Sequence, residues 1–121
     1  APDRVSASWG HANGCNIAGW DKRHGEEYVT MVLASIISGA GATASQDGWH
    51  AVGPECCFGA LTSGDIEMLE HSYPIVIHRY SLMEDSGGAG RNRGGSGTCW
   101  EVEPLDGPMT LVTFGEGRRI P

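Results

Sequence analysis

The chain has 121 residues and a net charge of −7, which suits one domain spanning 1–121 and argues against a nucleic-acid partner. No apolar run approaches the roughly 20 residues that a membrane helix needs, so we expect a cytoplasmic protein with no membrane partner. Glycine is the outlier, because it makes up 19 of the 121 residues, about twice its usual share. So many glycines in an ordered chain predict tight turns and close backbone contacts.

The first half of the chain predicts one hairpin followed by irregular backbone. Residues 16–20 suggest a short strand, and 21–25 contain the aspartate and glycine typical of a turn. The apolar stretch 28–37 favours the second strand of a hairpin, although its composition also tolerates helix. Residues 38–64 are rich in glycine and lack the period of a strand or a helix, which favours extended or polyproline-like segments.

The second half predicts one short helix and three strands. Acidic residues around 66–69 suit the start of one or two helical turns, which Pro74 would end. Residues 75–82 form the clearest strand. Strict alternation would separate its side chains into two faces, Val76, His78, Tyr80 and Leu82 against Ile75, Ile77, Arg79 and Ser81. Residues 98–102 and 109–114 predict two further strands, joined by a turn rich in proline.

These elements predict a mainly β fold class. We expect a small β-sheet or barrel-like domain with glycine-rich, extended or polyproline-like segments and at most one or two short helices. The sequence shows no internal repeat and no second domain.

The cysteines allow two interpretations. Cys15, Cys56, Cys57 and Cys99 could form two disulfides in a secreted protein, but nothing in the sequence indicates secretion, so reduced thiols are favoured. His50, Cys56 and Cys57 are weak candidates for a metal site, since imidazole and thiolate are zinc ligands. However, adjacent cysteines are poor co-ligands in a tetrahedral site. We therefore expect no metal and no other cofactor to be bound by this chain.

Two short motifs imitate catalytic or nucleotide sites. Asp85-Ser86-Gly87-Gly88 resembles the stretch around the nucleophile of serine proteases, but no histidine has the sequence context of a matching general base. Residues 39–44 imitate a dinucleotide-binding fingerprint, yet a turn follows where that fingerprint needs a helix. No Gly-Lys-Ser/Thr occurs, so the chain has no evident ATP site.

The loop at residues 85–97 is the most informative segment. Its glycines predict a structural element: Gly87, Gly88, Gly90, Gly94, Gly95 and Gly97. Arg91 and Arg93 alternate, so on an extended backbone they would share a face. Together with Asp85 and Ser86 they could bind an anionic substrate group or an interface, since arginine holds carboxylates and phosphates bidentately. In the alternative, each arginine pairs with a local acid, such as Glu84, Asp85, Glu101 or Glu103.

The same region carries a family resemblance. Residues 73–82 followed by 85–97 resemble the C-terminal signature of hydantoinase B/oxoprolinase subunits. The glutamates just before residue 73, the Gly-Ala-Gly-Ala stretch at 39–42 with the following Asp47-Gly48, and the segment 19–28 fit the same pattern. The likeness spans nearly the whole chain.

The resemblance implies part of an ATP-dependent cyclic-amide hydrolase, of hydantoinase or oxoprolinase type, or of a ketone carboxylase. It also implies a hydantoinase A-like partner that holds the ATP, a divalent metal bound outside this chain, and an oligomeric complex. The chain would be a C-terminal fragment or small subunit of a larger B-type component. Departures at Cys56-Cys57, Asn92 and Cys99-Trp100 leave the substrate open.

Two alternatives remain beside that interpretation. The chain could be a non-catalytic β-rich structural or interaction module of such a complex, or a freestanding serine hydrolase that uses Ser86.

Overall fold

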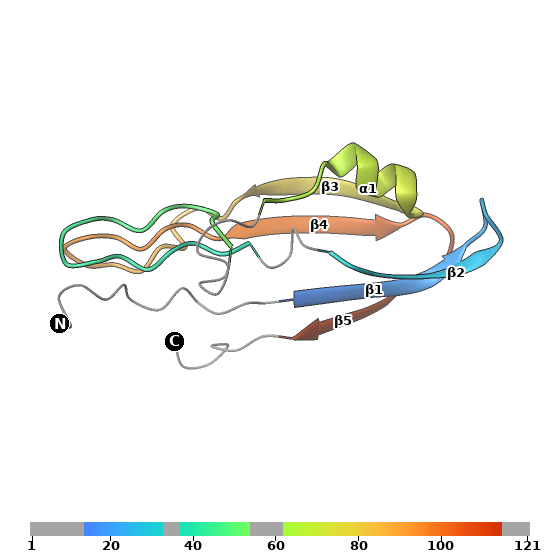
Figure 1. The fold of residues 1–121 in the computed structure, drawn as a ribbon, viewed down its shortest axis with the longest axis horizontal. Helices are drawn as coiled ribbons and strands as arrows, with labels where there is room; N and C mark the ends of the chain where they lie inside the picture. The colour runs from blue at the N-terminus through green and yellow to red at the C-terminus, as the bar shows by residue number, and fades with distance from the viewer. Residues whose placement is uncertain (1–13, 33–36, 54–61, 115–121) are drawn as a thin grey trace.

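The computed structural model describes residues 14–32, 37–53 and 62–114 (Figure 1). Its elements follow in chain order as β1 (Gly14–Asp21), β2 (Glu26–Met31), α1 (Ile66–Ser72), β3 (Ile75–Leu82), β4 (Thr98–Pro104) and β5 (Thr110–Phe114). Strands form two small antiparallel sheets, and glycine-rich segments outside the sheets extend to one end of the molecule. The expected mainly β fold class with a short helix is confirmed.

The first sheet has the strand order β2-β1-β5, with β1 in the centre. Ala18 of β1 lies opposite Val29 of β2 on one side and Thr110 of β5 on the other. The turn between β1 and β2 includes Gly25 at φ +71°, a conformation that glycine adopts without steric cost. The hairpin was predicted, but its second strand starts two residues earlier than expected and ends at Met31, well before residue 37.

The second sheet pairs β3 with β4 around a β-bulge. The pairing register shifts between Ile77 and Arg79, so His78 is an extra residue without a partner of its own. His78 and Arg79 are both exposed, after which Tyr80 lies opposite Trp100 and packs against the core. The predicted alternation is therefore wrong from His78 onward, because one inserted residue moves every following side chain to the other face.

The two sheets face each other across a small hydrophobic core. Its buried residues come from β1, from β3 and from the position just after β2: Cys15, Ile17, Val32 and Ile75. Partly buried aromatic and aliphatic residues pack around them: Tyr28, Tyr73, Tyr80, Trp100, Val102 and Met109. Figure 1 shows β3 and β4 on one side and the β2-β1-β5 sheet on the other. The arrangement is a two-layer sandwich with the core between the sheets, although the residues of β5 all stay exposed.

Helix α1 lies against β3 at the edge of this sandwich. Asp65 begins it as an N-cap, with its side chain accepting the Met68 N–H at 3.3 Å. The helix ends at Ser72, and the following Tyr73 N–H donates to the Leu69 carbonyl at 2.9 Å. The expected stop before Pro74 is thus confirmed. Among the described residues, no helix has the length and hydropathy of a membrane span.

Candidate functional site in the glycine-rich segments

Three extended segments, 38–43, 46–52 and 92–97, lie side by side at the end of the molecule away from the β1–β2 turn (Figure 1). Backbone hydrogen bonds of 2.7 to 3.0 Å join them to one another: Gly48 N–H to Arg93 O, Ala40 N–H to Trp49 O, Gly95 N–H to Ala40 O, and Ala51 N–H to Ser96 O. The Asn92 side chain adds a tie, donating to the Thr43 carbonyl at 2.9 Å. Each segment satisfies its polar backbone groups through another segment.

Four glycines occupy the places where two backbones touch. An added Cβ would lie only 2.0 Å from a backbone carbonyl oxygen at Gly39, 1.9 Å at Gly48, 2.1 Å at Gly87 and 1.9 Å at Gly95. Such distances leave no room for any side chain. The prediction that glycine serves close backbone contacts is confirmed at these positions, although two of the four lie outside the 85–97 loop.

The remaining glycines of that loop are less constrained. A Cβ on Gly90 would come within 2.9 Å of the Asn92 carbonyl oxygen, and one on Gly94 within 3.0 Å of the Gly88 nitrogen. Among the described residues, no atom outside the adjoining ones lies within 4 Å of such a Cβ on Gly88 or Gly97. The six glycines singled out in the sequence therefore differ in importance.

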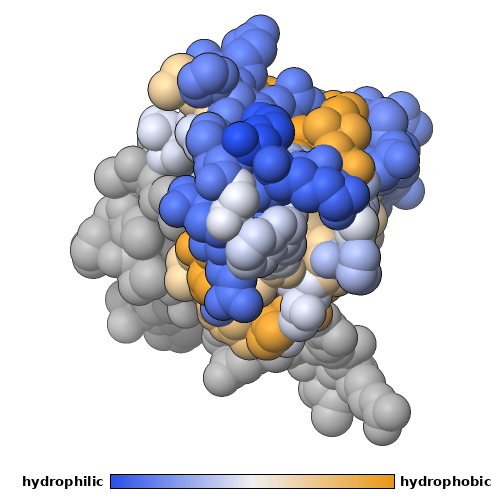
Figure 2. All heavy atoms as spheres, turned by 90° about the vertical axis from the view of Figure 1, so that its right-hand side faces the viewer, coloured by the Kyte–Doolittle hydropathy of each residue, from blue (hydrophilic) through white to orange (hydrophobic). Residues whose placement is uncertain are grey.

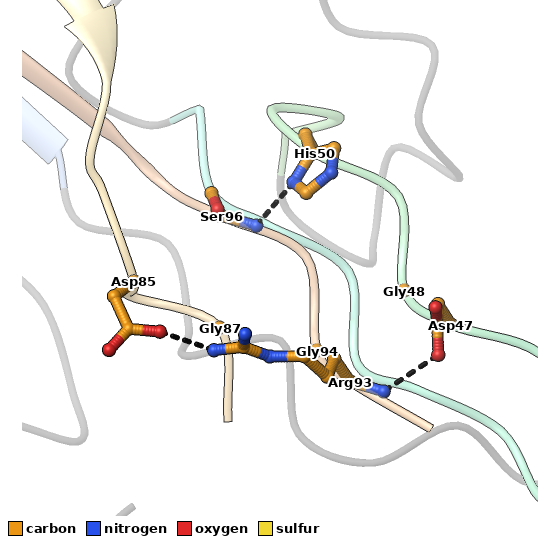
Figure 3. Close-up of a pocket in the computed structure, with 8 residues that line it drawn as sticks. All are labelled: Asp47, Gly48, His50, Asp85, Gly87, Arg93, Gly94 and Ser96. Atoms are coloured by element: carbon orange, nitrogen blue, oxygen red, sulfur yellow. Dashed lines mark hydrogen bonds and ion pairs between the residues drawn. The ribbon is translucent and has the colours of Figure 1, made fainter. Parts of the chain in front are cut away.

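A polar hollow with a volume of about 270 Å³ opens between the segments. The residues that line it are drawn in Figure 3: Asp47, Gly48, His50, Asp85, Gly87, Arg93, Gly94 and Ser96. Arg93 connects two of its walls, because its guanidinium forms an ion pair with Asp85 and its backbone N–H donates to Asp47 Oδ1 at 2.7 Å. We take this hollow as the candidate functional site.

The two arginines of the loop behave differently. Arg93 follows the local-acid alternative, since Asp85 accepts its guanidinium hydrogen bond. Asp85 adopts φ +51°, a left-handed conformation that aspartate tolerates better than most residues. Arg91 is exposed and forms no ion pair with the described residues. The structure therefore does not bring the two guanidinium groups onto one shared partner, and anion binding by Arg91 stays a prediction.

Ser86 has a structural environment. Its hydroxyl donates to the Met83 carbonyl at 2.9 Å and accepts the Gly97 N–H at 3.1 Å, so it joins the two ends of the loop. A serine nucleophile needs a hydrogen bond to a general base. His50 lines the hollow next to the loop, but its Nδ1 accepts the Ser96 N–H at 2.8 Å (Figure 3). No described histidine is within hydrogen-bond reach of Ser86, which weighs against the serine-hydrolase alternative.

The described residues do not fit a metal centre. No group of three or more His, Cys, Asp or Glu side chains in the described part of the chain could hold an ion. Of the weak candidates, His50 is engaged with Ser96, while Cys56 and Cys57 lie outside the described residues. Cys15 and Cys99 are free thiols, and burial raises the pKa of the Cys15 thiol. We therefore assign no metal-dependent chemistry to these residues.

A second polar cluster was missed in the sequence. Asp21 is 3% exposed, and its carboxylate accepts hydrogen bonds from the Arg23 N–H at 2.8 Å, the Arg23 Nη2 at 2.9 Å and His24 Nδ1 at 2.9 Å. Arg23 also donates to the carbonyls of Glu70 and His71, at the end of α1, at 3.4 and 3.3 Å. The cluster ties the hairpin turn to the helix. The signal available in the sequence was Asp21-Lys22-Arg23-His24, which was interpreted only as part of a turn.

Hydrogen bonding to Arg23 is the main cause that holds the pKa of Asp21 well below its usual value of 3.8. The hydrogen bond from His24 acts in the same direction, and desolvation opposes both. The cluster lies at the opposite end of the sandwich from the polar hollow. Its role is to hold the hairpin and the helix together.

The whole chain, residues 1–121, matches the family described as hydantoinase B/oxoprolinase. The chain belongs to the hydantoinase B/oxoprolinase family. Apart from His50, the residues that line the hollow lie in segments on which the sequence resemblance rested, 47–48 and 85–97.

Individual relatives agree with the family assignment. The chain is 70% identical over its whole length to the caprolactamase subunit beta of Pseudomonas jessenii, of which it spans 21%. The crystal structure of the ATP-dependent caprolactamase from that organism matches all of this chain with a TM-score of 0.83. An acetone carboxylase structure matches 91% of the chain at 26% identity and a TM-score of 0.76, over 15% of its own length. The chain thus spans about a fifth or less of these relatives.

Proposed function

We propose that this family member acts within the B-type component of an ATP-dependent enzyme that opens a cyclic amide, together with a hydantoinase A-like ATP-binding subunit. The observation that carries the proposal is the 70% identity over the whole chain to a caprolactamase subunit. In the overall reaction water adds across the ring C–N bond and gives a linear amino acid, while ATP is hydrolysed. A seven-membered lactam is the substrate that we favour.

The segment itself serves this enzyme as a structural part. The groups that line the hollow are largely engaged with one another: Arg93 with Asp85 and Asp47, and His50 with Ser96. Neither a base for Ser86 nor a metal-ligand set occurs among the described residues. We therefore assign ATP and any divalent metal to other parts of the complex. This agrees with the non-catalytic structural or interaction module considered from the sequence.

Ketone carboxylation is the second candidate. It is supported by the acetone carboxylase structure and by 32% identity over 77% of this chain to the acetophenone carboxylase delta subunit of Aromatoleum aromaticum. Both likenesses are much weaker than the one to the caprolactamase subunit, so we place carboxylation second.

The test is a substrate-dependent ATPase assay on the complete B-type subunit with its ATP-binding partner. Caprolactam, hydantoin, 5-oxoproline, and acetone or acetophenone with bicarbonate are offered separately. ATP hydrolysis stimulated by a lactam, with stoichiometric appearance of the amino acid, supports the proposal. Stimulation by a ketone with bicarbonate alone would overturn it in favour of carboxylation. Turnover by the B-type subunit without the partner would contradict the assignment of ATP binding.

A further inference from the structure

The outer face of the β2-β1-β5 sheet, the side turned away from the core, carries several large apolar side chains next to the polar residues Asn16, Glu27 and Thr110. Directly opposed residues of antiparallel strands point to the same face. Pairing places Asn16 opposite both Met31 and Val112, and Gly14 opposite Phe114. Alternation along β1 turns Cys15 and Ile17 into the core, so their neighbours point outward. We call the resulting set the outer patch: Trp20, Val29, Met31, Val112 and Phe114.

Every member of the outer patch is exposed. The exposed fractions run from 46% at Met31 and Phe114 to 75% at Val29. The ring of Phe114 lies over Gly14, where an added Cβ would come within 1.9 Å of Cζ. A set of large, exposed apolar side chains from three neighbouring strands is unusual on a surface that faces water.

The patch is also hollowed. Ala18 and Gly19 have small side chains or none, and together with residues of β2 and β5 they line a depression with a volume of about 350 Å³. Trp20 and Val29 form part of its wall. Glu27 and Thr110 also line the depression, and its apolar residues suit the insertion of a side chain from a packing partner.

The outer surface of the other sheet has a different character. There His78 bonds to Glu103 at 2.6 Å and Arg79 lies 4.0 Å from Glu101, all four being exposed. The end of the molecule that carries the β1–β2 turn is mostly hydrophilic, with hydrophobic residues in separate smaller patches (Figure 2). The outer surface of β3 and β4 is thus suited to water, whereas the outer patch is not.

We infer that the outer patch docks against the remaining part of a complete B-type subunit. This chain corresponds to only 21% of the caprolactamase subunit that it matches, so most of such a subunit lies outside it. A part of the same polypeptide has a high effective concentration and forms a permanent contact, the kind that is most apolar. Within the described part of the chain, β2 and β5 are the two edge strands of this sheet.

Oxidative footprinting of the complete subunit tests this inference without any substitution. Hydroxyl radicals oxidise Trp and Met side chains that water reaches, and mass spectrometry locates the products. Each residue is compared with its own rate in the urea-unfolded subunit. For Trp20 and Met31 we expect more than tenfold protection. Protection of only about twofold, which their exposures of 51% and 46% would give, overturns the inference.

The same readout separates the possible occupants. Protection that persists in the isolated subunit, diluted until it is monomeric, supports docking within the polypeptide. Loss of protection when the ATP-binding partner is removed would assign the patch to that partner, and loss on dilution would assign it to a second copy. Either loss overturns the inference.

A matched pair of variants adds a second readout. Val29→Lys places a charge in the outer patch and is expected to raise Trp20 oxidation several-fold. Leu105→Lys changes a similarly exposed apolar residue in the β4–β5 turn and should leave Trp20 unchanged. Equal effects of the two variants would count against the inference. Should Val29→Lys not fold, the footprint of the unsubstituted subunit decides.

Discussion

Gly95 lies directly against the backbone of Trp49. A Cβ on Gly95 would be 1.9 Å from the Trp49 carbonyl oxygen, while the Gly95 N–H donates to the Ala40 carbonyl at 2.8 Å. Gly95 thus contacts two segments that are distant in the sequence, one at Ala40 and one at Trp49. The contact leaves no room for a side chain at this position.

We expect Gly95→Ala to separate the glycine-rich segments. Overpacking a tight contact costs about 1–3 kcal/mol, so hydrogen exchange in 38–52 and 92–97 should become about tenfold faster or more, as measured by mass spectrometry. Gly88→Ala is the control, since nothing lies within 4 Å of its Cβ and its φ is not positive. Equal exchange in the two variants would contradict the role given to Gly95.

The Asp47 side chain should be needed as an acceptor rather than as a charge. It accepts the Arg93 N–H at 2.7 Å through Oδ1. Removing the acceptor by Asp47→Ala is expected to cost about 1 kcal/mol, detected as faster exchange of the Arg93 amide. Asp47→Asn keeps an acceptor oxygen at that place, so its stability should fall clearly less than that of Asp47→Ala. A larger loss with Asn than with Ala would point to a role for the charge.

Asp21 should make the stability of the sandwich depend on acid. Its pKa is depressed in the folded state, chiefly by Arg23, so the unfolded chain takes up the proton first as the pH falls. The stabilisation is present above an unfolded pKa of about 4 and declines below it. Asp21→Asn should lower the Tm by several degrees at pH 7, with a difference that shrinks toward pH 3.

The control for that measurement is Glu26→Gln, an exposed carboxylate of β2. The Tm of the Glu26→Gln variant is expected to match that of the unsubstituted protein at every pH. A difference between the Asp21→Asn variant and the unsubstituted protein that stays constant down to pH 3 would show that the Asp21 charge is not what matters.

The β-bulge at His78 predicts different losses in the free energy of unfolding for two nearby substitutions. Tyr80 packs against the core, whereas His78 is exposed. Tyr80→Ala is expected to cost about 2 kcal/mol, less than a fully buried aromatic residue, and His78→Ala under about 1 kcal/mol. Chemical denaturation compares them. Similar costs for the two substitutions would mean that strict alternation, which places His78 and Tyr80 on one face, describes β3.

Ser86→Ala should leave turnover of the assembled enzyme within about twofold. The hydroxyl joins Met83 and Gly97 across the loop and has no described histidine beside it. Removing two exposed hydrogen bonds costs stability on the order of 1 kcal/mol, which the rest of the loop can absorb. A loss of turnover of a thousandfold or more, with the Tm unchanged, would instead indicate a nucleophile.

Much of the local structure follows from short-range sequence signals. Alternating apolar residues predict β3, the proline-rich turn predicts the break between β4 and β5, and Asp65 with Pro74 brackets a helix. The family also follows from sequence, because its signature lies in contiguous residues at 73–97. Such features depend on neighbours a few residues apart.

The sequence alone determined that this chain is mainly β, rich in ordered glycine, and related to the hydantoinase B/oxoprolinase family. Tertiary structure decided which glycines are indispensable, which acid pairs with Arg93, and that His78 shifts the register. It also decided that the outer patch faces away from the core. The physical reason is that these properties arise between segments far apart in the chain, where only folding sets distance and direction.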